Sequence, residues 1–187
     1  MGFRPSPPLD EAGLRAAALD HLARRSDSAA GLARALARRV QRAAKAGRSR
    51  IADAETAIAA VVADLAERGL LSDRRYAESR ASHLVRRGRS RLAIQADLAA
   101  RGVARDDVAA ALAEVDAREP DSERAAAIAY ARRRRLGPWR DPALRAAKRQ
   151  ADMAALARAG FSGALVRAII DAPSPDHCVD PDSDTPI

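Results

Sequence analysis

The sequence predicts an all-α protein made of three tandem three-helix repeats that form an elongated, curved array. Apolar residues recur at helical spacing along nearly the whole chain, and no stretch alternates apolar and polar residues as a half-buried strand does. Of the 187 residues, 48 are alanine, the strongest helix former, and only five are aromatic. One pattern of apolar residues occurs three times, with a matching turn glycine in the second and third copies. Because alanine buries little surface, we expect thin seams of Leu, Val and Ile between the helices rather than one large core.

The first repeat is predicted over residues 10–71. Its three helices are expected from about Asp10 to Arg24, from a cap at Ser26 or Ser28 onward, and from Asp53 to the glycine at position 69. Serine and aspartate are preferred N-caps, and Gly69 occupies the position just beyond a helix where glycine commonly ends it. An insertion near residues 39–52 lengthens the central part of this repeat.

The second repeat is predicted over residues 72–118 and the third over residues 119–171. In the second repeat the helices are expected after a cap at Ser72 or Asp73, after a cap at Ser90, and after the glycine at position 102. In the third repeat they are expected from about Ser122 to Leu136, from Pro142 to Gly160, and around Val166 and Ile170.

Residues that match at fixed offsets identify the repeats. The second and third repeats match at an offset of 58 residues through Leu98 and Leu156, Gly102 and Gly160, Val103 and Phe161, Val108 and Val166, and Leu112 and Ile170. The first repeat matches the second in two pieces, at an offset of 62 around Leu32 and an offset of 50 around Ile58. The difference of 12 residues is the insertion. In such arrays each unit buries its apolar face against its neighbours.

The ends of the chain differ in composition from its body. Residues 1–9 are rich in proline, and residues 172–187 contain four aspartates but no lysine or arginine. The whole chain carries +8, so the chain without this acidic tail carries +12. Both ends are predicted to be disordered, and deletion of the tail is expected to leave folding intact.

Several classes of protein are excluded by what the sequence lacks. A single cysteine cannot form an internal disulfide, no apolar run approaches the ~20 residues that span a bilayer, and the first residues lack a signal peptide's apolar stretch. The histidines do not have the spacing of metal ligands, and no phosphate loop, nucleophile elbow or paired-acid pocket is found. We therefore expect a cytoplasmic monomer that is not an enzyme, needs no cofactor or metal, and does not bind a membrane.

Two stretches of the sequence carry a family resemblance. GLLSDRRYAES, the basic stretch after it and SRLAIQADLAARGV together resemble the RecX regulators of bacterial recombination. RRRRLGPWRDP followed by ALARAGFS is similar to the C-terminal part of the same family. The resemblance covers roughly residues 14–171 and is most specific over 69–103. It implies three tandem three-helix repeats that bind the RecA filament on single-stranded DNA and modulate RecA, usually by inhibiting it. The insertion departs from the family, because it displaces a short glycine turn.

Seven arginines and a single acid, Glu78, lie from Arg74 to Arg91. A helical wheel at ~100° per residue places the apolar side chains of residues 73–87 on one side and arginines on the other. The binding residues predicted here are Arg75, Arg86, Arg87, Arg89 and Arg91. We expect them to contact DNA phosphates or an acidic surface of the filament. The alternative is a solvated face whose arginines pair with acids of neighbouring repeats.

A second basic stretch, residues 132–149, holds eight basic residues against one acid, Asp141. The binding residues predicted here are Arg132, Arg133, Arg134, Arg135 and Arg140. Four consecutive helical residues cannot share one outward face, so at least one of the four is expected to point toward the protein unless the helix frays. Trp139 could stack on a base, but we expect it to hold its loop against the protein body.

Three functions are compatible with a basic helical array. The leading hypothesis is a regulator that binds the RecA–DNA filament. The alternative is a module that binds nucleic acid directly, such as a helix-turn-helix regulator, although such readers usually dimerise on half-sites. A third possibility is a scaffold that binds neither. Binding to bare single-stranded DNA, compared with RecA-coated DNA at the same salt concentration, distinguishes the three.

Overall fold

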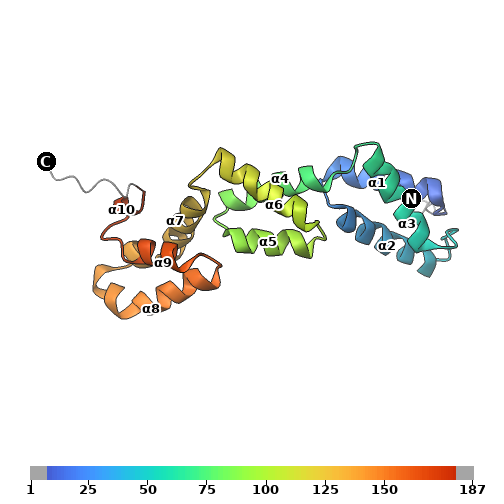
Figure 1. The fold of residues 1–187 in the computed structure, drawn as a ribbon. Coiled ribbons are helices and arrows are strands. Elements are labelled where there is room, and N and C mark those ends of the chain that lie inside the picture. Colours follow the sequence, from blue (N-terminus) through green and yellow to red (C-terminus); the bar gives the residue numbers. More distant parts are fainter. Residues whose placement is uncertain (1–7, 180–187) are drawn as a thin grey trace. The chain divides into compact units, whose positions relative to one another are not determined.

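The computed structural model describes residues 8–179, and this part of the chain is all-α apart from one isolated β-bridge. The nine predicted helices are present as α1 (Glu11–Arg24), α2 (Ala29–Lys45), α3 (Ala54–Glu67), α4 (Asp73–Arg86), α5 (Arg91–Ala100), α6 (Arg105–Arg118), α7 (Ser122–Arg134), α8 (Pro142–Arg158) and α9 (Gly163–Ile170) (Figure 1). They follow one another as three helix triplets, α1–α3, α4–α6 and α7–α9. Two short elements were not predicted, the 3₁₀ turn η1 (Gly137–Trp139) and the helix α10 (Asp176–Val179).

Local capping residues set where the helices begin. Ser28 rather than Ser26 caps α2, because its Oγ accepts a hydrogen bond from the Gly31 amide at 3.0 Å. The carboxylate of Asp53 caps α3 by accepting from the Thr56 amide at 3.1 Å. These bonds satisfy backbone donors that the first turn of a helix leaves without a partner.

The chain divides into two compact units, and the division passes through the second repeat. The first unit comprises the described residues up to Ala77 together with Ala99–Asp107. The second comprises Glu78–Leu98 together with the described residues from Val108 onward. Each unit therefore contains one whole repeat and its junction with part of the second repeat.

The core of the first unit lies among α1, α2 and α3, where Leu14, Leu32 and Leu36 are at most 2% exposed. Leu9 also belongs to this core, although residues 1–9 were predicted to be disordered. Its amide donates to the Arg48 carbonyl at 2.8 Å, and its carbonyl accepts from the Arg50 amide at 2.9 Å. The prediction of disorder is thus wrong for residues 8 and 9, because the end of the insertion binds Leu9. Residues 1–7 lie outside the described part of the chain.

The third repeat has a separate core among α7, α8 and α9, with Leu156 and Ile169 at most 1% exposed. Residues 172–179 were predicted to be disordered as part of the acidic tail, but Ala172 and Cys178 pack on this core. Cys178 on α10 is 0% exposed, and its carbonyl accepts from Arg124 Nε at 3.0 Å. The prediction is wrong for this segment because the buried Cys178 side chain and the bond from Arg124 to the Cys178 carbonyl anchor it. Residues 180–187 are outside the described range.

The first junction between repeats rests on two hydrogen bonds from the start of α2. The buried Ser28 Oγ, which caps α2, also donates to the carbonyl of Arg101 at 2.7 Å. The next amide, that of Ala29, donates to the carboxylate of Asp73 at 2.7 Å. The cap of a middle helix thereby holds both the middle helix and the first helix of the following repeat.

The second junction repeats this arrangement at the start of α5. The Ser90 Oγ donates to the carbonyl of Ala159 at 2.5 Å, and the Arg91 amide donates to Glu123 at 2.8 Å. Burial raises the pKa of Glu123 although the amide bond favours its charged form. The matching serines at positions 28 and 90 thus make equivalent bonds at the two junctions.

Glycine is required beside both junctions. Gly102 and Gly160 follow the two accepting carbonyls, and they adopt φ values of +81° and +92°. A Cβ on Gly102 would lie 2.5 Å from the Ala30 Cβ, and one on Gly160 would lie 2.6 Å from the Ser90 Oγ. The left-handed conformation and the close approach both exclude other residues.

Candidate functional site

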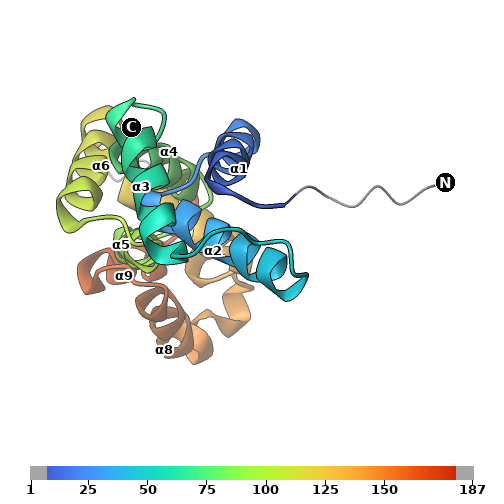
Figure 2. The ribbon, with the colours of Figure 1, turned by 90° about the vertical axis from the view of Figure 1, so that its right-hand side faces the viewer.

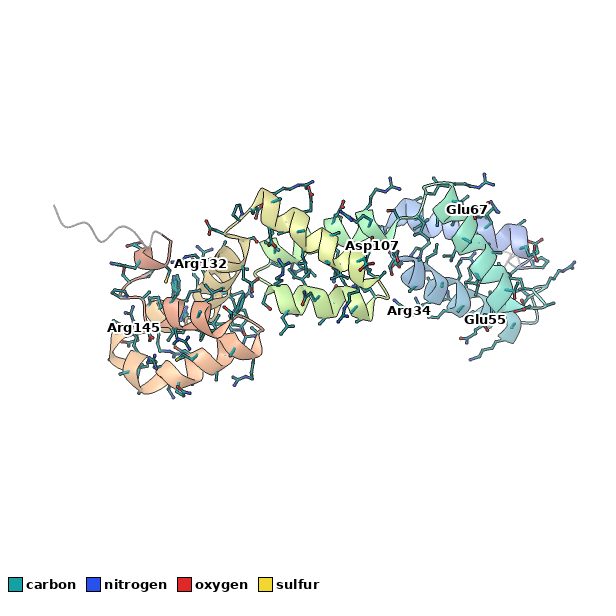
Figure 3. All side chains as sticks on the ribbon, viewed as in Figure 1. Arg34, Glu55, Glu67, Asp107, Arg132 and Arg145 are labelled. Carbon is teal, nitrogen blue, oxygen red and sulfur yellow. The ribbon has the colours of Figure 1, made fainter. Side chains whose placement is uncertain are left out.

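The two basic stretches singled out in the sequence meet in the second unit. The turn between α4 and α5 packs against α7, where a Cβ on Gly88 would lie 3.1 Å from the Ala126 carbonyl. At the same turn, Arg133 Nη1 donates to the carbonyl of Arg87 at 3.3 Å. The arginines of this turn therefore lie beside those at the end of α7, where Figure 3 labels Arg132.

The arginines that meet here are all exposed, and we call them the α4–α7 basic cluster. The cluster consists of Arg86, Arg87, Arg89, Arg132, Arg133, Arg134 and Arg135. It lies where α4 and α7 both end. Carbonyl groups at a helix C-terminus favour nearby cations, which helps to explain why so much positive charge is tolerated at this point. Sequence reasoning identified all seven residues but treated them as two separate stretches.

The end of α7 explains why four consecutive arginines are exposed. The helix stops at Arg134, and Arg135 adopts a left-handed conformation with φ of 54°. The chain then turns inward to the buried Leu136, whose amide donates to the Ala131 carbonyl at 2.9 Å. All four arginines are exposed because the helix ends within the run, although Arg133 still reaches the carbonyl of Arg87.

The ring of Tyr130 lies beneath two arginines of the cluster. The guanidinium carbons of Arg133 and Arg134 lie 5.8 and 5.0 Å from the centre of its ring. The ring makes an edge-to-face contact with Phe161 in the core of the third repeat, with centroids 5.8 Å apart. Cation–π attraction therefore restrains two of the seven guanidinium groups near the surface.

The three predicted binding residues outside the cluster have partners within the fold. Arg75 donates to the carbonyl of Gly69, and Arg91 forms an ion pair with Asp116. Arg140 binds Asp152, whose side chain is only 3% exposed. These contacts stabilise the fold, but they are not the pairs with acids of neighbouring repeats that the alternative interpretation expected, because Arg75 binds a carbonyl and Asp116 belongs to the same repeat as Arg91.

The pair of Arg140 and Asp152 fixes the turn that contains Trp139. Two nitrogens of Arg140 donate to the two carboxylate oxygens at 2.7 and 2.8 Å, and the Gly137 amide adds a bond at 3.0 Å. Burial alone would raise the pKa of Asp152, but these hydrogen bonds hold it below its usual value. Trp139 is half-buried against the core of the third repeat, which confirms that it anchors its loop.

Other basic residues of the 132–149 stretch also contribute to folding. Arg149 makes two bonds of 2.7 Å to Asp171, which join α8 to the end of α9. Arg145, labelled in Figure 3, donates to the carbonyl of Pro173 at 2.8 Å. The stretch is thus divided between residues that stabilise the third repeat and the exposed run at the end of α7.

The α4–α7 basic cluster has the chemistry of an anion-binding surface. A guanidinium group presents donors in a planar fork that matches a phosphate or a carboxylate. Contacts of this kind to phosphates give affinity without reading a base sequence. Within residues 8–179, no group of three or more acids, histidines and cysteines is arranged to hold a metal ion. The described helices also include none that is long and apolar enough to cross a bilayer.

Comparisons with known proteins agree on one family. Residues 72–112 match the family model for the second three-helix domain of RecX. The chain is 41% identical over 160 residues to the regulatory protein RecX of Myxococcus xanthus (strain DK1622), covering 85% of this chain and 84% of that protein. A crystal structure of a regulatory protein RecX has a similar fold, with a TM-score of 0.62 at 19% identity over 91% of this chain and 82% of that chain.

Proposed function

Because this chain belongs to the RecX family of regulatory proteins, we propose that it binds the RecA–DNA filament and inhibits RecA activity in recombination and DNA repair. The observation that supports this function is the α4–α7 basic cluster, in which seven exposed arginines from two helix ends lie together. In this proposal the protein acts as a cytoplasmic monomer, without a cofactor and without catalysing a reaction.

The cluster would contact DNA phosphates or an acidic surface of the filament. Each phosphate that an arginine neutralises releases counterions, so the affinity would fall by roughly 0.7 to 0.9 log units per log unit of salt. Several arginines acting together would therefore give a steep salt dependence. Binding through acidic side chains of RecA alone would also weaken with salt, but its affinity would not depend on which DNA the filament contains.

The experiment compares two variants with the same change in charge. The cluster variant carries Arg86→Glu, Arg87→Glu and Arg89→Glu, which leaves the two arginines on Tyr130 in place. The control variant carries the same change at three exposed arginines outside the cluster, namely Arg25, Arg39 and Arg105. Exposed substitutions usually change stability by about 0.5 kcal/mol or less each, so both variants should remain folded and helical.

RecA ATPase activity and strand exchange are measured with each purified protein, and circular dichroism verifies folding. The wild type and the control variant should inhibit RecA, whereas the cluster variant should not. A folded cluster variant that inhibits as well as the wild type would exclude Arg86, Arg87 and Arg89 as contact residues. A wild-type protein without any effect on RecA would reject the proposed function itself. Equal binding to bare and RecA-coated single-stranded DNA would instead favour a direct nucleic-acid-binding module.

A further inference from the structure

An apolar groove of about 730 Å³ runs between α2 and α3 in the first unit. These two helices lie side by side, as Figure 2 shows. Small side chains form much of the lining, among them Ala30, Ala33, Ala37 and Ala44 on α2 and Ala59 on α3. Figure 3 labels one charged residue from each wall, Arg34 on α2 and Glu55 on α3.

A comparison of the three repeats indicates that, within residues 8–179, this surface is less covered in the first repeat than in the other two. Val62 in the first repeat corresponds to Leu112 in the second and Ile170 in the third. Leu112 and Ile170 are 2% and 7% exposed, whereas Val62 is only partly buried and lines the groove. The position is thus covered in two repeats and only partly covered in the first.

The two edges of the groove differ in charge. Helix α2 carries five basic residues and no acid. A helical wheel places Arg34, Arg38 and Lys45 along its edge beside the alanines that line the groove, and all three are exposed. The α3 edge is formed by Ala59 and neighbouring small residues, with Glu55 near its start. The groove therefore combines an apolar floor with one basic edge.

We propose that this groove binds an amphipathic helix of a protein partner, with large apolar side chains on one face and acidic residues along the edge that meets α2. Amphipathic helices commonly bind in grooves of this kind through apolar residues spaced three and four apart. Small residues on the walls let the backbone of a bound helix approach closely. Helix α2 has 17 residues, so the groove is about 25 Å long at 1.5 Å per residue.

Other occupants fit the groove less well. A nucleic acid needs donors for its phosphates, but the floor of the groove is formed by alanine, valine and isoleucine side chains. A second copy of this chain would bring further positive charge, since its net charge is +8. The inference does not rest on the proposed function, because the groove and the α4–α7 basic cluster belong to different units.

Two labelled synthetic helical peptides of about 18 residues, long enough to span the groove, test the proposal with the full-length chain. Both have leucines at helical spacing on one face, and they carry either glutamates or lysines along one edge. Fluorescence anisotropy measures their binding. The glutamate peptide should bind at least about tenfold more tightly than the lysine peptide, a difference of about 1.4 kcal/mol. This comparison requires no variant of the protein.

Matched substitutions then locate the site. Ala59→Leu fills the groove, whereas Ala60→Leu makes the same change at an exposed neighbour outside its lining. Arg38→Glu reverses the basic edge, whereas Arg39→Glu reverses an exposed charge on another face of α2. Ala59→Leu should weaken binding of the glutamate peptide by about tenfold, and Arg38→Glu should weaken it by about threefold. The two control substitutions should leave this binding unchanged.

Four results would overturn the proposal. The first is no binding of the glutamate peptide, and the second is equal binding of both peptides. The third is that the folded Ala59→Leu and Arg38→Glu variants both bind the glutamate peptide as tightly as the wild type does, which would place the peptide elsewhere. Release of the bound peptide by single-stranded DNA from wild type, but not from the cluster variant, would likewise place it on the basic cluster. RecA assays on the same variants report separately on the proposed function.

Discussion

Replacing Ser90 by alanine removes two interactions at once, the cap of α5 and the hydrogen bond that joins the second and third repeats. Ser90 is 1% exposed; its Oγ accepts from the Ala93 amide at 3.2 Å and donates to the Ala159 carbonyl at 2.5 Å. Loss of an N-cap costs about 1 kcal/mol. Loss of the second hydrogen bond adds about 1 kcal/mol. The free energy of unfolding should therefore fall by about 2 kcal/mol.

Two further variants separate the cap from the bond between repeats. Ser162 caps α9 through the Leu165 amide at 3.4 Å and is exposed, so Ser162→Ala should cost about 1 kcal/mol or less. Ser90→Asp keeps a residue that caps helices well, but its ionised carboxylate cannot donate to the Ala159 carbonyl. It should therefore destabilise the protein at least as much as Ser90→Ala, even though the cap is retained.

Urea denaturation with two probes measures these effects. Far-UV circular dichroism reports on all helices, whereas the fluorescence of Trp139, the single tryptophan, reports on the third repeat. Repeat proteins are coupled through the interfaces between adjacent units, so a weakened junction should also separate the midpoints of the two probes. Equal losses for Ser90→Ala and Ser162→Ala, with coincident midpoints in both, would refute the inference that Ser90 couples the repeats.

Two other predictions concern the third repeat. Arg140→Ala leaves the buried Asp152 carboxylate without its ion pair and should lower the free energy of unfolding by about 3 kcal/mol at neutral pH. Because the pKa of Asp152 lies below its usual value, this loss should shrink as the pH falls through that pKa, and a loss independent of pH would contradict the assignment. Deleting residues 172–187 removes the buried Cys178 and should destabilise the protein by about 2 kcal/mol, whereas deleting only 180–187 should not. Equal melting temperatures for the two truncations would show that α10 contributes nothing.

The positions of the helices could be predicted because the signals that set them are local. A serine or aspartate that binds an amide two or three residues later marks a helix start wherever it occurs, as Ser28 and Asp53 show. The repeat was recognisable because Gly102 and Gly160 meet the same two requirements, a left-handed backbone and a close neighbour. Each of these constraints acts on residues that adjoin in the sequence or recur at a fixed offset.

The roles of individual arginines could not be predicted, because their partners are distant in the sequence. Only one acid lies within the first basic stretch, but Asp97 and Asp116 reach two of its arginines from α5 and α6. Counting charges along the chain therefore overestimates the number of arginines available to a partner. The proximity of the two stretches was also hidden, because it depends on how the turn at Gly88 packs on α7.

The short ordered segments at the two ends were missed for a different reason. Leu9 and Cys178 each anchor a segment with a single buried side chain, among prolines and charged residues. One apolar residue produces no periodicity, so composition alone favours disorder. The surrounding structure supplies the remaining stabilisation, through the Arg48–Arg50 backbone at one end and Arg124 at the other.

The middle helix of the third repeat begins differently from the middle helices of the first two repeats. Its first residues lack the donors that join one repeat to the next. In α2 and α5 a serine cap donates to a carbonyl of the next repeat, and the following amide donates to an acid. Helix α8 begins instead with Asp141, whose carboxylate accepts from the Ala143 amide at 3.0 Å, followed by Pro142. An ionised carboxylate cannot donate, and proline has no amide hydrogen. The third repeat therefore cannot form either bond to a further repeat, and the chemistry that joins two junctions cannot build another one there.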